Sequence, residues 1–291
     1  MPLTHTRTFR IRSYECDANG HLNNANYLRF MQETAFDASA AAGYGPQRYQ
    51  EMDSLWLIRE SSVEFLTPLR YNDRVEVTTW IADFRRVSSR RAYEFRITDS
   101  CELAARAYTD WVYLSTETGR ATSIPEQMAA AFYPEGIPHS FPARQPYPAA
   151  PPPPEGAFRW RRKVEWQDID QMQHVNNAVY LEYASECGAN HVSAVGWPWE
   201  RMQAAGFAIF LRSNHIQYKQ PALLHDELEI TTWLYQVRRS TAMRIYTIRR
   251  ASDNALLSEI HAKGVCVNLA TGQPIRWPEE LMADLNPSIA P

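Results

Sequence analysis

The feature that most constrains this chain is an internal repeat. Residues 14–128 recur without a gap at an offset of 153 residues. The best-preserved segment reads ECDANGHLNNANYL in the first copy and DIDQMQHVNNAVYL in the second. A repeat of this length indicates a duplicated domain, because solenoid repeats have periods of about 20 to 50 residues. The 291 residues suffice for two domains, each with its own core.

A proline-rich segment separates the two copies. Prolines stand at positions 134, 138, 142, 146, 148 and 151–154. Proline removes backbone donors and fixes φ, so we predict an extended, semi-rigid strap that belongs to neither core. The predicted organisation is domain 1 over residues 1–132, a linker over 133–157 and domain 2 over 158–291.

Each copy shows the same order of predicted elements. A β-like run is followed by a polar loop, an amphipathic helix and four further β-like runs. The expected ranges are 8–15, helix 25–42, 55–66, 74–82, 89–98 and 103–114 in copy one, and 159–167, helix 178–195, 207–218, 227–235, 241–249 and 256–268 in copy two. Consecutive strands after one helix predict an α+β fold, in which a mostly antiparallel sheet packs on a single long helix.

These patterns resemble a known family. The opening with Asp17, Gly20, Asn26 and Tyr27, and the later segment 80–91, are similar to hotdog-fold thioesterases of the 4-hydroxybenzoyl-CoA thioesterase type. The spacing Asp17-x-Asn19-x-His21-x-Asn23-Asn24 resembles acyl-acyl-carrier-protein thioesterases, which carry two hotdog domains in one chain. The resemblance implies tandem hotdog domains that form a pseudo-dimer within the chain.

The polar loop is the candidate catalytic site. Asp17, Asn19 and His21 alternate just before a helix N-terminus, where free N–H groups would favour a developing oxyanion. A thioester is already activated, so a carboxylate can attack it or deprotonate a water. We expect Asp17 to act as nucleophile or general base, Asn19 to orient water or the carbonyl, and His21 to hydrogen-bond the carboxylate or carbonyl.

The second copy keeps Asp170 and His174 but has Met172 where the first has Asn19. Methionine cannot orient a water through a strong hydrogen bond, so copy one is predicted to be the better-equipped site. Helix carboxylates serve other hotdog thioesterases, which makes Glu33 and Glu186 secondary catalytic candidates, although a solvated glutamate is the commoner case.

Further matched residues are candidates for substrate binding. Helix capping also explains Asn23 and Asn24. The arginine pairs would by resemblance meet the phosphates of coenzyme A or phosphopantetheine. The set comprises Asn23, Asn24, Tyr27, Asn176, Asn177, Tyr180, Arg85, Arg86, Arg238 and Arg239.

Charge and composition limit the kinds of partner and the cellular location that we expect for this protein. The net charge of −3 gives no reason to expect nucleic acid or an anionic membrane. Four scattered cysteines read as reduced, buried thiols, and no segment reads as a signal peptide or membrane span, which predicts a cytoplasmic protein. Histidine spacing indicates no metal site, and the chemistry needs no cofactor. A homodimer of such chains is compatible with the pattern.

The predicted function is hydrolysis of acyl-CoA or acyl-carrier protein to a carboxylic acid and a thiol, as in fatty acid metabolism. One alternative is a hotdog hydratase or dehydratase, but its D-x-N-P-x-H motif has histidine five residues after the aspartate, against four here. The other alternative is a non-catalytic acyl-binding module, for which loss of the aspartates would be expected.

Overall fold

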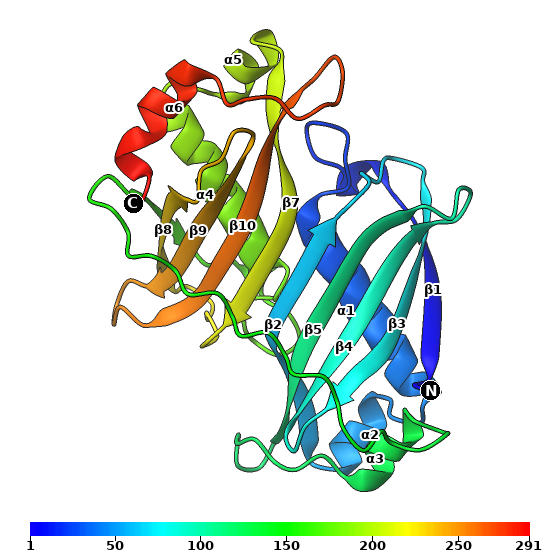
Figure 1. The fold of residues 1–291 in the computed structure, drawn as a ribbon. Helices are drawn as coiled ribbons and strands as arrows, with labels where there is room; N and C mark the ends of the chain where they lie inside the picture. Colours follow the sequence, from blue (N-terminus) through cyan, green and yellow to red (C-terminus); the bar gives the residue numbers. More distant parts are fainter. The chain divides into compact units, whose positions relative to one another are not determined.

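The computed structural model describes residues 1–291 in two compact units (Figure 1). Domain 1 comprises Met1–Pro146 and domain 2 comprises Tyr147–Pro291. Each is described by itself below. None of the helices combines the length and apolar character that crossing a membrane would require.

Domain 1 contains five strands and one long helix. Its elements are β1 (Thr4–Arg10), the 3-10 turn η1 (Ser13–Glu15), α1 (Asn24–Ala41), α2 (Pro46–Glu51), β2 (Ser54–Phe65), β3 (Arg74–Phe84), β4 (Ser88–Ile97), β5 (Leu103–Ser115) and α3 (Glu126–Ala131).

Domain 2 repeats this order. Its elements are β6 (Phe158–Lys163), η2 (Trp166–Asp168), α4 (Val179–Ala194), α5 (Trp199–Ala204), β7 (Phe207–Tyr218), β8 (Glu227–Tyr235), β9 (Thr241–Arg250), β10 (Leu256–Asn268), α6 (Glu279–Leu285) and η3 (Asn286–Ser288).

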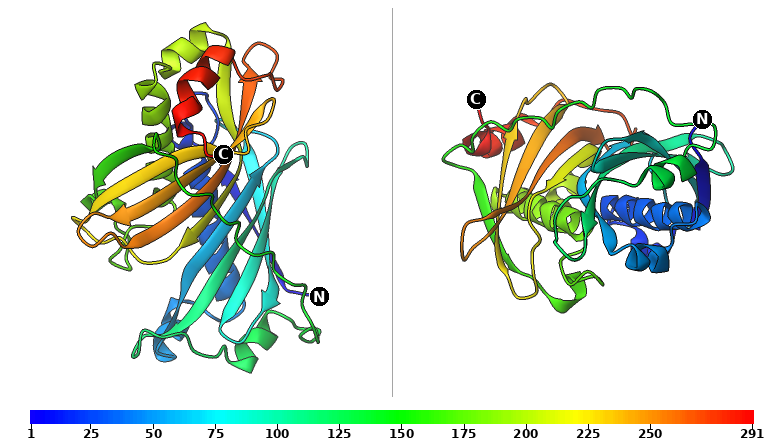
Figure 2. Two further views of the ribbon diagram at one scale, coloured as in Figure 1. Left: turned by 60° about the vertical axis from the view of Figure 1, so that its left-hand side comes forward. Right: turned by 90° about the horizontal axis from the view of Figure 1, so that it is seen from below.

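Within each domain the sheet is antiparallel, and the long helix lies along one of its faces (Figure 2). The strand order is β1-β3-β4-β5-β2 in domain 1 and β6-β8-β9-β10-β7 in domain 2. Alternate residues of β3, among them Val75 and Val77, are fully buried, as are Leu28 and Met31 of α1. Two tandem hotdog domains, the predicted fold class, are therefore confirmed.

The backbone is duplicated even where side chains differ. Residues with positive φ fall at matched positions, including Gly20 (φ 74) with Gln173 (φ 62) and Cys101 (φ 57) with Asn254 (φ 57). This conformation favours glycine, so a glutamine that adopts it is held there by the surrounding loop. The turn geometry of the two domains is thus more similar than their residues.

A β-bulge distinguishes the outer face of domain 1, the face turned away from α1. Ile81 pairs with Arg91 and Asp83 with Arg90, so Ala82 is an extra residue in β3. The extra residue turns Asp83 away from the face that carries Ile81. The paired stretch of β8 in domain 2 has no such shift in register.

The strap does contribute to packing, contrary to the prediction that it belongs to neither core. Tyr133 is buried, and Ile137 and Phe141 pack against the same apolar cluster of domain 1. Ala150 and Ala157 pack beside Trp233 in domain 2. Apolar residues between the prolines give the strap surface to bury, which the proline count alone did not reveal.

The cysteines are all unpaired, as expected, but they are not all buried. Cys187 and Cys266 are buried and Cys16 is partly buried, whereas Cys101 is exposed in the turn between β4 and β5. Its positive φ places it at the tip of a tight turn, where no core surrounds it.

Candidate active site

The polar loop of domain 1 is a closed turn between η1 and α1. The Asp17 N–H donates to the His21 carbonyl at 2.7 Å, and the Gly20 N–H donates to the Asp17 carbonyl at 2.9 Å. Gly20 supplies the left-handed conformation that this turn requires. The loop is therefore fixed by its own backbone before any side chain contributes.

The Asp17 carboxylate has one engaged and one free oxygen. Its Oδ1 accepts from the N–H groups of Asn19 at 2.8 Å and His21 at 3.1 Å. Its Oδ2 has no hydrogen bond within the protein, and the residue is exposed. The first oxygen orients the carboxylate, and the second remains available for a water or a substrate.

Asn19 and His21 flank this carboxylate. The Asn19 side chain makes no hydrogen bond within the chain and is half-buried. Burial lowers the pKa of the His21 imidazole, Arg70 lowers it further, and Asp17 acts in the opposite direction. His21 is therefore neutral at neutral pH and offers one donor and one acceptor nitrogen. Arg70, which pairs with His21 as an isolated β-bridge, was not foreseen from the sequence.

Helix capping explains Asn23. Its side-chain oxygen accepts from the Ala25 N–H at 3.0 Å and caps α1. Asn176 does the same for the Ala178 N–H at 3.0 Å. Asn24 is half-buried at the first position of α1, and Asn177 accepts from the Tyr218 hydroxyl through its carbonyl at 2.9 Å.

The two matched tyrosines are buried positioning residues. Tyr27 and Tyr180 are each 3 % exposed. The Ala222 N–H donates to the Tyr180 hydroxyl at 3.0 Å, and Leu69, its counterpart in domain 1, makes the same kind of bond with Tyr27. Burial raises the pKa of Tyr180 to about 12. These side chains tie the helix to the β2–β3 or β7–β8 connection and do not reach the surface of the loop.

The loop of domain 2 has the same backbone but a more fully occupied carboxylate. Asp170 Oδ1 accepts from the Met172 N–H at 2.9 Å, and Oδ2 accepts from the Asn176 side chain at 3.2 Å. Met172 is 46 % exposed. His174 is half-buried, with Nδ1 lying 3.3 Å from the Val175 carbonyl. Neither oxygen of Asp170 is left without a protein partner.

The helix glutamates lie away from the loops. Glu33 is nine residues beyond the start of α1, or about 13 Å along the helix. It is exposed and lies 3.3 Å from Arg7, and Glu186 lies 2.9 Å from Arg162. The structure therefore does not join these secondary candidates to the polar loops, because the helix carries them to the first strand instead.

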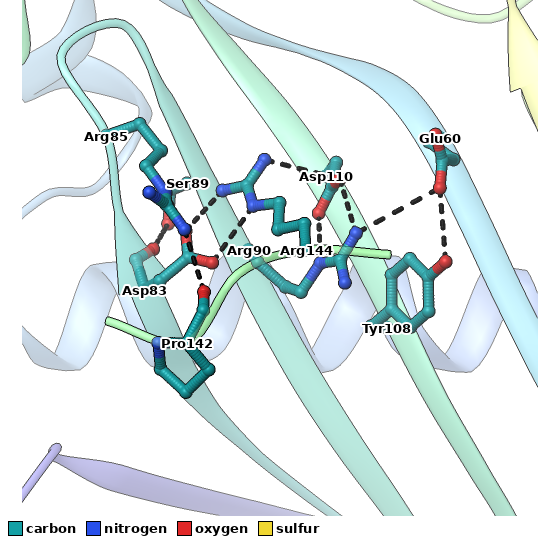
Figure 3. Close-up of polar contacts among 9 residues, drawn as sticks. All are labelled: Glu60, Asp83, Arg85, Ser89, Arg90, Tyr108, Asp110, Pro142 and Arg144. Atoms are coloured by element: carbon teal, nitrogen blue, oxygen red, sulfur yellow. Dashed lines mark hydrogen bonds and ion pairs between the residues drawn. The ribbon is translucent and has the colours of Figure 1, made fainter. Parts of the chain in front are cut away.

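The predicted arginine patch of domain 1 is largely occupied by protein partners (Figure 3). Arg85 donates to the Pro142 carbonyl at 2.8 Å and lies 3.9 Å from Asp83. Arg86 donates to Ser123 at 3.4 Å. A phosphate would have to compete with these contacts, which sequence spacing did not reveal. In domain 2, Arg238 and Arg239 are exposed.

A network of ion pairs fills the outer face beside that patch. Arg90 forms a bidentate contact with Asp110 at 2.7 and 2.8 Å, and the Arg144 guanidinium from the strap binds both Asp83 and Asp110 (Figure 3). Tyr108 donates to Glu60 at 3.1 Å. No group of three or more His, Cys, Asp or Glu side chains is placed to hold a metal ion.

Comparison with known proteins places this geometry in a family. The profile of the thioesterase-like superfamily matches residues 11–132 and again residues 164–285. The chain belongs to the thioesterase-like superfamily. Both matches include the polar loop and its helix, so the duplication seen in the sequence is a duplication of this family's domain.

Curated relatives cover different shares of the chain. A chloroplastic acyl-[acyl-carrier-protein] hydrolase of Cuphea viscosissima is 27 % identical over 195 residues, which are 63 % of this chain and 47 % of that protein. The long-chain acyl-CoA thioesterase FadM of Escherichia coli is 29 % identical over 126 residues, which are 42 % of this chain and 92 % of FadM. The chain thus spans about half the length of the plant relative.

Solved structures support the fold. A putative oleoyl thioesterase from Lactobacillus plantarum superimposes with a TM-score of 0.78 at 17 % identity, over 91 % of this chain and 96 % of that one. The 12:0-ACP thioesterase from Umbellularia californica gives 0.71 at 18 % identity, over 90 % and 93 %. At these identities the likeness concerns the tandem fold alone.

Proposed function

We propose that this protein hydrolyses acyl thioesters carried by coenzyme A or by an acyl-carrier protein, and that Asp17 performs the reaction. The observation that carries the proposal is the Asp17 carboxylate, which is oriented through Oδ1 and free at Oδ2, in a chain whose two halves both match the thioesterase-like superfamily. The names of the plant hydrolase and of FadM support the two kinds of carrier.

Two routes fit this carboxylate. In the first, Oδ2 attacks the thioester carbonyl, the C–S bond breaks and the thiolate takes a proton from water; a second water then cleaves the resulting anhydride. In the second, Asp17 removes a proton from a water that attacks the carbonyl directly. Both routes end in a carboxylic acid and a thiol. Asn19 orients the water or carbonyl, and neutral His21 can donate to the carbonyl oxygen.

Domain 1 is the better-equipped site in this proposal. Its loop has the Asn19 amide where domain 2 has Met172, and its aspartate keeps a free oxygen where Asp170 accepts from Asn176. The first difference removes a polar side chain from the loop of domain 2, and the second occupies the carboxylate oxygen that would react. Asp170 and His174 would then retain at most a slower reaction.

The test is a panel of acyl-CoAs and acyl-carrier proteins of varied chain length, including aromatic acyl groups, in which the free acid is measured. Measuring the acid avoids interference from the exposed Cys101 thiol, which would react with thiol reagents. Turnover that is lost in Asp17→Asn supports the proposal. Binding of the thioesters without any hydrolysis would contradict the proposed hydrolase function and favour the alternative of a non-catalytic acyl-binding module.

A further inference from the structure

We propose that Arg70 is a further residue of the domain 1 site, where its guanidinium stabilises the anion that forms at the thioester carbonyl and, afterwards, the carboxylate product. This inference rests on the proposed function. Nothing in the sequence comparison of the two loops pointed to Arg70, because it lies in the β2–β3 connection, nearly fifty residues further along the chain.

The backbone brings Arg70 to the polar loop. His21 and Arg70 form an antiparallel β-bridge, and the Leu22 N–H donates to the Leu69 carbonyl at 2.7 Å. Side chains of directly opposed residues in such a pair extend to the same face. The guanidinium of Arg70 and the imidazole of His21 are therefore neighbours, and the Arg70 charge adds to burial in lowering the pKa of His21.

No acidic side chain of the protein neutralises the positive charge of Arg70. Its side chain is exposed and makes no hydrogen bond or ion pair within the chain, whereas its backbone N–H donates to Asp73 at 2.7 Å. Arg85, by contrast, has Asp83 and the Pro142 carbonyl as partners. Arginine stays protonated through the whole working pH range, so it can stabilise an anion without changing its own state.

Domain 2 has no charged residue at the position of Arg70, and at two other positions near the loop it has acidic residues where domain 1 has arginines. Leu223 stands at the position of Arg70. Two more arginines close to the domain 1 loop, Arg12 beside Glu15 and Arg29 on Asn26, are replaced by glutamates in domain 2. The replacements are Arg12 by Glu165, Arg29 by Glu182 and Arg70 by Leu223. Domain 1 thus has three arginines where domain 2 has two glutamates and a leucine, which favours a developing oxyanion in domain 1.

The decisive substitution is Arg70→Leu, which installs the domain 2 residue. We expect kcat/KM to fall about 10- to 100-fold, because oxyanion stabilisers contribute up to about 1000-fold where they contact the oxygen directly. Arg70→Lys keeps the charge and should recover most of the activity. Arg74→Leu, at an exposed arginine four residues away, is the matched control and should change the rate less than about twofold.

Two readouts do not depend on turnover. Direct binding of the carboxylate product, measured by calorimetry, should weaken about tenfold in Arg70→Leu and stay unchanged in Arg74→Leu. The His21 resonance, assigned among the eight histidines with His21→Asn, should titrate at higher pH in Arg70→Leu than in the native protein. If neither carboxylate affinity nor the His21 titration responds, Arg70 has no role in the site. A protein that hydrolyses no thioester but shows both responses would refute the proposed function and leave the anion site standing.

Discussion

Each polar loop holds its aspartate by the same backbone turn, but the Oδ2 oxygen of that aspartate has different hydrogen-bond partners in the two domains. In domain 1 it has no protein partner, and in domain 2 it accepts from Asn176. A free, oriented oxygen is what attack on an acyl group requires. This hydrogen bond is therefore one chemical difference between the two loops, beside the exchange of Asn19 for Met172.

Asp17→Asn should lower kcat/KM by about 100- to 10,000-fold, the range expected for loss of a catalytic acid–base group. The asparagine oxygen can still accept from the Asn19 and His21 N–H groups, so the loop should keep its shape. Asp170→Asn, the matched control, should cost less than about threefold. Steady-state rates of acid release measure both, and equal losses would contradict the preference for domain 1.

The matched turn positions Gly20 and Gln173 allow a reciprocal test of backbone strain. Both have positive φ, and an added Cβ at Gly20 would meet no atom within 4 Å, so only the backbone preference is at stake. We expect Gln173→Gly to raise the free energy of unfolding by about 1 kcal/mol and Gly20→Gln to lower it by about 1 kcal/mol. Chemical denaturation measures both. Changes of the same sign in the two variants would show that side-chain contacts, and not the backbone φ preference, determine the free energy of unfolding.

His191 predicts a dependence of stability on pH. It is 2 % exposed, its Nδ1 lies 2.8 Å from Arg244, and burial and then Arg244 lower its pKa to about 3. Between pH about 6.5 and 3 the unfolded chain binds a proton that the folded protein does not, so acidification destabilises the fold. At pH 5 the loss should be about 2 kcal/mol.

His191→Asn keeps an acceptor for Arg244 but cannot titrate, so it should flatten the fall in unfolding free energy between pH 7.5 and 5. His139→Asn, the same exchange at an exposed position, is the control. Urea titrations at several pH values provide the measurement. A slope that His191→Asn leaves unchanged would assign the acid sensitivity to other groups.

At the scale of elements, the bulge in β3 has a clear consequence for the strap. By turning Asp83 to the outer face, it creates a binding place for the Arg144 guanidinium, which also reaches Asp110 at 3.3 Å. Asp83 is almost completely buried, so it depends on this cation. The domain 1 half of the strap is thus held by charge.

Arg144→Met should lower the free energy of unfolding of domain 1 by about 1–3 kcal/mol, because it leaves a buried carboxylate without its main partner. Proteolysis within residues 134–146 should become faster. Arg106→Met removes an exposed ion pair with Glu94 and should cost less than about 0.5 kcal/mol. In a double-mutant cycle, Asp83→Asn should relieve part of the Arg144→Met penalty; strictly additive losses would argue against the pair.

Most elements were predictable because their patterns are long. The ranges of β7, β8 and β10 agree with the prediction, and α1 is displaced by one residue. The first strand was placed too late, at 8–15, because the turn Ser13–Glu15 continues its alternation of polar and apolar residues. The short helices α2, α3, α5 and α6 were missed, since six or seven residues carry too little periodicity.

The site was predictable only where its residues are local. The Asp17–His21 loop is five residues long and visible as a motif. The neutralised Arg85–Arg86 patch was not, because its partners Asp83, Ser123 and Pro142 come from three separate segments. Arg70 was missed for the same reason. Motif spacing finds contacts along the chain, whereas the sheet creates those across it.

At the scale of the whole molecule, the two domains have the same backbone fold. They differ in the side chains that anchor the proline-rich strap. Domain 1 binds the strap through Arg144. In domain 2 the Tyr147 hydroxyl donates to the carbonyl of Glu259 at 2.7 Å, and its ring packs edge-on against His215 at 4.5 Å. Duplication therefore fixed the scaffold, while the two halves of the strap are anchored by different chemistry.

The thiols should react in the order of their exposure. Cys101 lies open in its turn, whereas burial raises the pKa of Cys266 to about 11 and also that of Cys187. A thiolate is the reactive species, so one equivalent of maleimide should modify Cys101 first. Peptide mass mapping identifies the labelled residue. Comparable labelling of Cys187 would show that its surroundings open readily.

The exposed turn that contains Cys101 is also a suitable site for a spin label. Cys101 and Asn254 occupy equivalent points of the two domains with the same φ of 57°. In Asn254→Cys a pair of spin labels would therefore lie at matching positions of the two copies of the domain. The distance between them, measured in solution, reports directly on whether the two halves associate as the pseudo-dimer that the repeat predicts.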